Sequence, residues 1–294
     1  MATPDVARPA VFTPRDVEPS VVLSSKHSVR AVMNYYKDPE DGSPPVPFYI
    51  DRPYAEQIHA RPTAEVEVEV TDITGSEDKY TLDSHGFQLV GHESSEKRFL
   101  DEEKIKTQYY AETEQLIKDV TGAVRVFVFD YTLRRQKDPA APDLRVSGPL
   151  RSVHIDQSYS ASVERVRHHF PGEAEQLLQK RFQIINVWRP IKTILKDPLA
   201  VADSHSVAES DLVGAAIVFP HKRGETYVVK PNPNHRWYFK YAQRPDQVTL
   251  IKCYDSLESG GAARRVPHSA FVDPAEEDKE PRESIEVRAL VFYD

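Results

Sequence analysis

Two residues that can bind a metal lie one position apart near the middle of the chain. His154 and Asp156 flank a single isoleucine in the segment of residues 152–158. At the end of a strand, alternate residues share a face, so the imidazole and the carboxylate would point the same way. With a second histidine from a distant strand, they would form a facial set of two His and one carboxylate, which leaves positions open on iron(II) for oxygen chemistry. The same spacing is common in surface pairs and core histidines, so this interpretation needs support from other residues.

His268 is the preferred second histidine among the eleven in the chain. It lies in a short apolar segment, residues 265–271, far downstream of His154. His235 lies in a turn that enters a predicted strand, and we interpret it as structural or close to a substrate. His235 is the alternative third metal ligand.

Two arginines beyond His268 could bind a carboxylate, because a guanidinium matches a carboxylate with two hydrogen bonds. Arg282 is followed two residues later by Ser284, whose hydroxyl could donate to the same carboxylate. Arg288 lies two residues after Glu286, where a structural ion pair is the more ordinary explanation. The two arginines have the same strand parity, so the pattern does not separate them. We favour Arg282.

Composition limits the classes of partner and the location of the protein. A net charge of -8 and a pI near 5.8 argue against a nucleic-acid binder, whose affinity depends on cationic contacts to phosphate. One cysteine, Cys253, permits no internal disulfide and no thiolate zinc site, so nitrogen and oxygen atoms must bind any metal. The chain shows no secretory signal and no apolar stretch approaching eighteen residues. We therefore predict a cytoplasmic protein with no membrane partner.

The predicted elements divide the chain into an arm and a body. Residues 1–62 are rich in proline with scattered aromatic residues, which predicts an extended arm packed on the body. Residues 63–294 form the body. Helical spacing predicts helices at 101–120 and 162–182, the second one interrupted by a Pro-Gly pair. Alternation and β-branched or aromatic runs predict strands at 65–70, 87–90, 123–129, around 154, 182–188, 212–219, 225–230, 237–241, 248–254, 266–272 and 284–292.

Strands dominate the second half of the chain, and the few helices lie between the earlier strands. This order fits neither a regular βαβ alternation nor a helical bundle. We predict a mainly β fold with flanking helices, a double-stranded β-helix or jelly roll. The mouth of such a barrel can hold a metal and a small ligand.

The chain resembles a family of fungal and bacterial iron(II)- and 2-oxoglutarate-dependent oxygenases typified by gibberellin desaturase. The hydroxylase/desaturases of aspergillic acid biosynthesis and the cephalosporin hydroxylase of cephamycin biosynthesis are similar. The resemblance extends from about residue 70 to residue 294. It is carried by LDSHGF at 82–87, VHIDQS at 153–158, NVWRP at 186–190, HRWYF at 235–239, KCYDS at 252–256, PHSAF at 267–271 and RESIEVRALVF at 282–292.

The resemblance implies a jelly-roll oxygenase domain over residues 63–294, with iron(II) bound by His154, Asp156 and His268. It also implies that an arginine of the last strand binds the distal carboxylate of 2-oxoglutarate. The Arg282 and Ser284 pair is similar to the arginine-serine pair of many relatives. Such enzymes use 2-oxoglutarate and O2 to oxidise a C–H bond, with hydroxylation, desaturation and ring formation as the possible outcomes.

The expected substrate is a small secondary metabolite. Trp188, Arg189 and Tyr238 are candidate substrate contacts, and Arg189 would suit an acidic group on the substrate. Packing is an equal explanation for each of them. Two other functions stay open from the sequence: a jelly-roll metalloenzyme with non-redox Lewis-acid chemistry, and a non-catalytic small-molecule-binding protein. Neither accounts for the arginine after His268.

Overall fold

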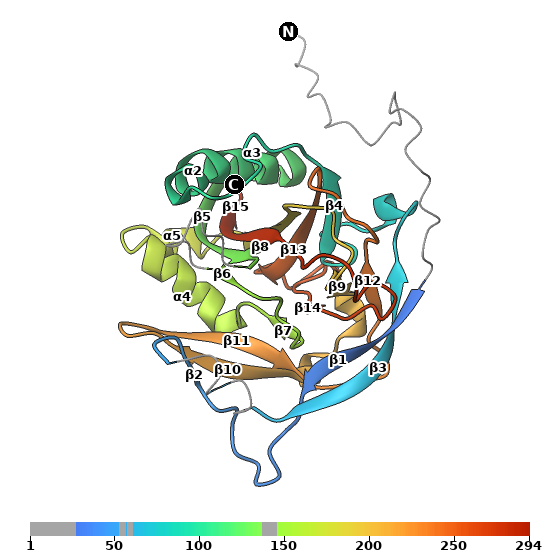
Figure 1. Ribbon diagram of the computed structural model, residues 1–294. Coiled ribbons are helices and arrows are strands. Elements are labelled where there is room, and N and C mark those ends of the chain that lie inside the picture. The colour runs from blue at the N-terminus through green and yellow to red at the C-terminus, as the bar shows by residue number, and fades with distance from the viewer. Residues whose placement is uncertain (1–27, 53–56, 58–60, 137–145) are drawn as a thin grey trace.

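The computed structural model describes residues 28–52, 57, 61–136 and 146–294, which form two β-sheets with helices along one side (Figure 1). The fold is mainly β with flanking helices, as predicted. The strands are β1 (Ser28–Tyr36), β2 (Phe48–Tyr49), β3 (Thr63–Asp72), β4 (Phe87–Gly91), β5 (Arg125–Arg134), β6 (Val146–Ser147), β7 (His154–Ile155), β8 (Phe182–Pro190), β9 (Leu199–Ala202), β10 (Leu212–Val218), β11 (Arg223–Val229), β12 (Trp237–Phe239), β13 (Gln247–Asp255), β14 (His268–Ala270) and β15 (Ser284–Phe292).

The first predicted helix is a continuous helical segment of three parts. It comprises α2 (Glu102–Lys104), a π-helical turn η2 (Ile105–Tyr109) and α3 (Tyr110–Thr121). The side chain of Asp101 accepts hydrogen bonds from two backbone N–H groups of the first turn, which satisfies donors that have no partner within the helix. Gly122 ends the helix with φ of 71°, a left-handed conformation that glycine adopts without steric cost.

The second predicted helix is divided at the Pro-Gly pair into α4 (Tyr159–His169) and α5 (Ala174–Leu177). Ser158 caps α4 by accepting a hydrogen bond from the backbone N–H of Ala161. The described residues also contain three short 3-10 turns: η1 (Glu77–Lys79), η3 (Ser204–Ser206) and η4 (Glu209–Asp211).

The six-stranded sheet has the order β4-β13-β8-β15-β5-β6. Its central strands β8 and β15 are buried along almost their whole length. One face packs on α3, where Ile185 and Val187 of β8 share an apolar cluster with Leu116 and Ile117. Since alternate residues point to opposite faces, Asn186 and Trp188 face the other way, toward the larger sheet.

The nine-stranded sheet has the order β1-β3-β12-β9-β14-β7-β11-β10-β2. It places β14 directly beside the two-residue strand β7, with His268 opposite His154. Strand β9, which the sequence pattern did not predict, lies on the other side of β14. Residues distant in sequence therefore become neighbours at the centre of this sheet.

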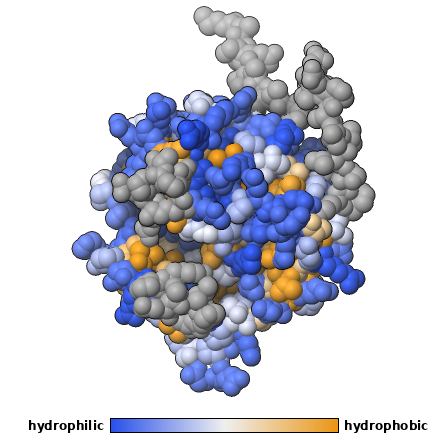
Figure 2. Space-filling model, in the orientation of Figure 1, coloured by the Kyte–Doolittle hydropathy of each residue, from blue (hydrophilic) through white to orange (hydrophobic). Residues whose placement is uncertain are grey.

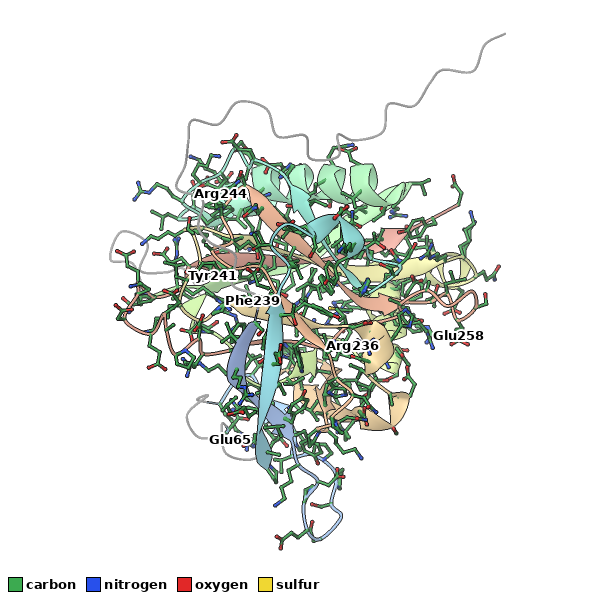
Figure 3. All side chains as sticks on the ribbon, turned by 90° about the vertical axis from the view of Figure 1, so that its right-hand side faces the viewer. Glu65, Arg236, Phe239, Tyr241, Arg244 and Glu258 are labelled. Carbon is green, nitrogen blue, oxygen red and sulfur yellow. The ribbon has the colours of Figure 1, made fainter. Side chains whose placement is uncertain are left out.

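The predicted arm contributes a full strand to the larger sheet. β1 pairs with β3 along its length, from Ser28 opposite Thr71 to Tyr36 opposite Thr63. Figure 3 shows this side of the molecule, with Glu65 near one end of β3 and Phe239 of β12 beside the other end. The part of the arm before Ser28 lies outside the described residues, and the boundary at residue 62 stays a prediction.

The surface in Figure 2 is mainly hydrophilic, with small separate hydrophobic areas. Val32, Val46 and Val124 are the large hydrophobic side chains that are more than 40% exposed among the described residues. In the same part of the chain, none of the helices is long and apolar enough to span a membrane.

Candidate metal centre

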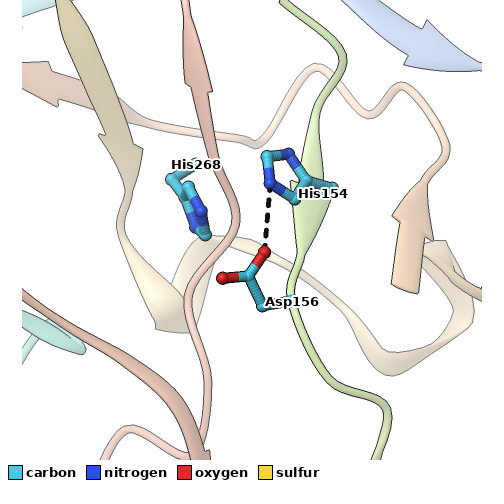
Figure 4. Close-up of side chains that lie close together, drawn as sticks. All are labelled: His154, Asp156 and His268. Carbon is cyan, nitrogen blue, oxygen red and sulfur yellow. Dashed lines mark ion pairs between the residues drawn. The ribbon is translucent and has the colours of Figure 1, made fainter. Parts of the chain in front are cut away.

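The structure brings His154, Asp156 and His268 together between the two sheets (Figure 4). The rings of His154 and His268 lie on neighbouring strands with their centroids 4.4 Å apart. Asp156 follows β7, and its Oδ1 lies 3.3 Å from Nε2 of His154. One possible ligand atom from each residue falls within 4.8 Å of the other two, so all three can reach a single ion.

Both imidazoles offer a nitrogen lone pair at this point. His154 Nδ1 lies 2.8 Å from the carbonyl oxygen of Ser152, and because a carbonyl only accepts, Nδ1 carries the proton and Nε2 is free. Neither ring nitrogen of His268 has a hydrogen-bond partner among the described residues, although both are buried. Burial, and then the charge of His154, lower the pKa of His268 to about 4, so its imidazole is neutral near pH 7. A buried nitrogen without a partner fits a metal ligand.

Asp156 uses its two oxygens differently. Oδ2 accepts hydrogen bonds from Nδ2 of Asn186 at 2.6 Å and from Nε of Arg288 at 2.7 Å. Oδ1 is the oxygen beside His154. Burial acts to raise the pKa of Asp156, but the charge of Arg288 outweighs burial and holds this pKa well below its usual range. The carboxylate is therefore ionised and ready to bind a cation.

Arg288 is surrounded by acceptors and is not free for a ligand. In addition to Asp156, its Nη1 donates to Oγ1 of Thr132 at 2.9 Å and lies 3.5 Å from Asp130. Its Nη2 lies 3.6 Å from Oε2 of Glu286. Burial acts to lower the pKa of Arg288, but these carboxylates raise it.

Arg282 lies two residues before β15 and has few hydrogen-bond partners. Its Nη1 donates to the carbonyl oxygen of Asp197 at 2.9 Å, while its Nε is buried without a partner among the described residues. Oγ of Ser284, which is fully buried, also lacks one. Burial lowers the pKa of Arg282 to about 10. Asp197 has φ of 53°, a strained conformation for a residue with a side chain, and its carboxylate pairs with Arg151 at 2.7 Å.

Comparison with known proteins identifies the family. A family model described as an oxidoreductase/YMDC permease-like domain matches residues 33–292. The alpha-ketoglutarate-dependent dioxygenase tstK of Talaromyces stipitatus is 35% identical over 282 residues, 92% of this chain and 99% of that protein. The hydroxylase/desaturase efuI of Hormonema carpetanum is 38% identical over 249 residues, 77% of this chain and 83% of that protein. The chain belongs to the iron(II)- and 2-oxoglutarate-dependent dioxygenases.

A solved structure supports this assignment at the level of the fold. The iron and alpha-ketoglutarate-dependent endoperoxidase NvfI, known from Aspergillus novofumigatus, matches with a TM-score of 0.78 at 28% identity, over 91% of this chain and 98% of NvfI. The predicted jelly roll is therefore confirmed. The dioxygenase uses iron(II), 2-oxoglutarate and O2, acts on a small molecule and belongs to secondary-metabolite biosynthesis.

The candidate substrate residues of the dioxygenase lie in three different places. Trp188 is 2% exposed, directly opposite Glu286 on β15, with its ring 5.6 Å from the guanidinium carbon of Arg282. Tyr238 lies opposite Val201, which is itself opposite His268, so Tyr238 and His268 share a face of the larger sheet. Tyr238 also packs on Tyr80, with ring centroids 4.9 Å apart.

The structure does not bring Arg189 to the triad. Arg189 lies on the α3 side of β8, where it donates to the hydroxyl of Tyr109 at 3.1 Å and to the carbonyls of His92 and Pro245 at 2.7 and 2.9 Å. His235, the alternative metal ligand, lies between Tyr35 at 3.1 Å and Asp211 at 3.0 Å. Both side chains therefore use their hydrogen bonds to join separate segments of the fold.

Two residues beside the triad were not predicted as site residues. Asn186 was noticed only as part of a family segment, and Glu286 only as a possible ion-pair partner of Arg288. The signal that could have found Asn186 is a polar residue at the centre of the apolar run 182–188. A buried amide in such a run needs partners, and here they are two carboxylates.

Proposed function

We propose that His154, Asp156 and His268 bind the iron of this dioxygenase, and that Arg282 with Ser284 binds the distal carboxylate of 2-oxoglutarate. The enzyme would then oxidise a C–H bond of a small secondary metabolite by hydroxylation, desaturation or ring formation. The observation that carries this proposal is the meeting of three side chains from two strands and a following loop, each with a free metal-binding atom.

When bound, iron(II) with 2-oxoglutarate supplies the oxidising chemistry, in which 2-oxoglutarate becomes succinate. The protein contributes orientation and exclusion of water. The hydrogen bond from His154 to the Ser152 carbonyl fixes the ring, and the donors on Oδ2 of Asp156 fix the carboxylate. Trp188 is buried, and its ring lies 5.6 Å from the guanidinium carbon of Arg282, so it would shield a ligand bound there from water.

Arg282 is the better candidate for the cosubstrate because its donors are available. A buried guanidinium with an unpartnered Nε and a buried hydroxyl two residues away are costly without a ligand, and a carboxylate would satisfy both. Arg288 is the alternative. It already donates to Asp156 and Thr132, so a carboxylate would have to displace these bonds.

Anaerobic titration of the metal-free protein with iron(II) tests the metal site. We expect one iron per chain, a spectral change on addition of 2-oxoglutarate, and succinate formation under air that increases with substrate.

His154→Ala, Asp156→Ala and His268→Ala should each lose iron and turnover while keeping the fold. His235→Ala and the exposed His205→Ala should retain iron. Iron loss in His235→Ala, with iron retained in His268→Ala, would show that the third ligand is His235.

We also propose that the substrate carries an acidic group, which binds near Arg165 of α4. Arg165 makes no hydrogen bond or ion pair with a described residue, and its guanidinium carbon lies 4.9 Å from the centroid of Phe129. Phe129 precedes Asp130, which is opposite Arg288 across the sheet, so Arg165 lies beside the strand that carries a partner of Asp156. Burial lowers the pKa of Arg165. Lys222 is a second cation in this region. Burial lowers the pKa of Lys222, and the charge of Arg165 lowers it further.

Paired substrates test the acidic group. Acidic metabolites that stimulate succinate formation should stimulate it less as their methyl esters. Arg165→Gln should raise the KM for the acid by roughly 10- to 150-fold, the loss of one charged hydrogen bond, while the KM for 2-oxoglutarate stays the same. Equal stimulation by acid and ester would overturn this part of the proposal.

We also propose a cytoplasmic location, which the free, buried Cys253 supports and which cell fractionation would check.

A further inference from the structure

We propose that Arg288 and Asn186 are positioning residues that occupy Oδ2 of Asp156, so that Asp156 presents only Oδ1 to the metal. This inference rests on the proposed metal site and adds a cause for its coordination number. A carboxylate can bind a cation through one oxygen or through both. An iron site that must accept a chelating cosubstrate and still keep a position open cannot give up that position to a second carboxylate oxygen.

The geometry around Asp156 separates the two oxygens. Oδ2 accepts two short hydrogen bonds, at 2.6 Å from Asn186 and 2.7 Å from Arg288. The bond from the Arg288 cation is a strong one, and together with the bond from the Asn186 amide it uses the acceptor directions of Oδ2 that a metal would need. Oδ1 has no such donor and lies 3.3 Å from the free nitrogen of His154.

Glu286 keeps both donors in place. Its Oε1 accepts from the same Nδ2 of Asn186 at 2.7 Å, and its Oε2 lies 3.6 Å from Arg288. Across the sheet, Arg288 is opposite Asn186 and Glu286 is opposite Trp188, so the side chains lie on one face. The pairing of β15 with β5 shifts register between Arg288 and Ala289, a bulge of the kind that directs side chains into active sites.

The arrangement predicts a specific defect when the donors are removed. If Oδ2 becomes free, Asp156 can bind through both oxygens and take one further metal position. The metal would still bind, because the three ligand residues remain and a repelling cation is gone. 2-Oxoglutarate would still have two coordination positions on the metal, but no position would remain for O2. We therefore expect kcat to fall by roughly 10- to 100-fold while the KM for 2-oxoglutarate changes little.

Manganese(II) added to the metal-free protein gives a readout that does not depend on activity. Solvent-proton relaxation counts the water molecules on the ion, which should be three in the wild type and one after addition of 2-oxoglutarate, for an octahedral ion with three protein ligands. In Arg288→Met and in Asn186→Leu the water count should fall toward two without 2-oxoglutarate and toward zero with it. Arg288→Lys retains a charged donor and should restore the wild-type counts and part of kcat.

Arg135→Met is the matched control for loss of a buried arginine. Arg135 is 8% exposed and pairs with Glu283 at 2.7 Å, so its loss should destabilise the fold without changing the water count. Wild-type counts in both Arg288→Met and Asn186→Leu would overturn the inference, even if both variants lose stability. A wild type that binds no manganese, or binds it equally after Asp156→Ala, would instead overturn the proposed metal site. If Arg288→Met does not fold, Asn186→Leu decides.

Discussion

Two arginines with the same strand parity, one before β15 and one within it, have the same chemistry in opposite environments. Arg282, just before the strand, and Arg288, near its middle, share strand parity, and both are buried. Arg288 has carboxylates around it and Arg282 has none in ion-pair contact among the described residues. The difference appears in their pKa values: burial lowers that of Arg282 to about 10, whereas Asp156, Glu286 and Asp130 overcome burial and raise that of Arg288.

This contrast separates an arginine whose charge is neutralised by carboxylates of the fold from one that has no anion in ion-pair contact among the described residues. A buried cation whose charge is already neutralised holds its partners in place. One that lacks an anion is destabilising until an anion binds. The unsatisfied hydroxyl of Ser284 beside Arg282 indicates the same state. Four predictions test or refine the comparison.

The largest expected effect is the loss of stability when Arg288 is removed. Arg288→Met leaves Asp156 and Glu286 as buried carboxylates without their cation, which costs about 3–5 kcal/mol of the free energy of unfolding of the metal-free protein. Urea denaturation measures this. A change below about 1 kcal/mol would mean that the ion pairs of Arg288 are compensated by solvent.

Removal of Arg282 should affect 2-oxoglutarate and not the metal. Losing the charged partner of a buried carboxylate costs about 2–5 kcal/mol, so Arg282→Ala should weaken 2-oxoglutarate by a factor on the order of thirty or more. Anaerobic titration of the iron-loaded protein measures the affinity. If Arg282→Ala binds normally and a conservative Arg288→Lys change weakens the cosubstrate by this amount, the carboxylate binds at Arg288. If neither matters, the assignment of the cosubstrate to this strand fails.

The same arginine should have the opposite effect on the protein without ligands. Arg282→Met replaces a buried, unpaired charge by an apolar side chain against Trp188, so the metal-free protein should gain about 1–4 kcal/mol of unfolding free energy. Addition of iron and 2-oxoglutarate should stabilise the wild type but not this variant beyond the effect of iron. A destabilised metal-free variant would show that the bond from Arg282 to the Asp197 carbonyl is structurally necessary.

The smallest effect, per pH unit, is a pH dependence of the unfolding free energy that comes from His268, in the triad next to Arg288. His268 has a pKa of about 4 in the folded metal-free protein, below its usual 6.5, because of burial and then the charge of His154. The unfolded state therefore binds more protons, and unfolding free energy should fall as pH falls from 6.5 to about 4, by at most about 1.4 kcal/mol per unit from this group. His268→Gln should lose this component, while Arg282→Met and His205→Gln should keep it.

The sequence itself determined the elements and the chemistry of the candidate residues. Alternation at residues 65–70 predicted β3, and the apolar run at 182–188 predicted β8, because period and β-branched content are local properties. His154 and Asp156 were recognised from their spacing, His268 from the short apolar segment around it, and Arg282 from its distance from His268 and the serine two residues later. Strand β9 was missed, since four consecutive apolar residues carry no clear period. β1 was missed within a segment interpreted as an extended arm.

Only the tertiary structure decided which side chains meet. Arg282 and Arg288 have the same parity and the same chemistry, so the sequence could not separate their surroundings. The neighbours on β5 and β8, and Asp156 after β7, make these surroundings different. Arg189 suited an acidic ligand by type, yet the alternation of β8 turns it toward α3 and turns Asn186 toward Asp156. A side chain's partners across a sheet depend on register between distant strands, and register is fixed by the packing of the whole fold.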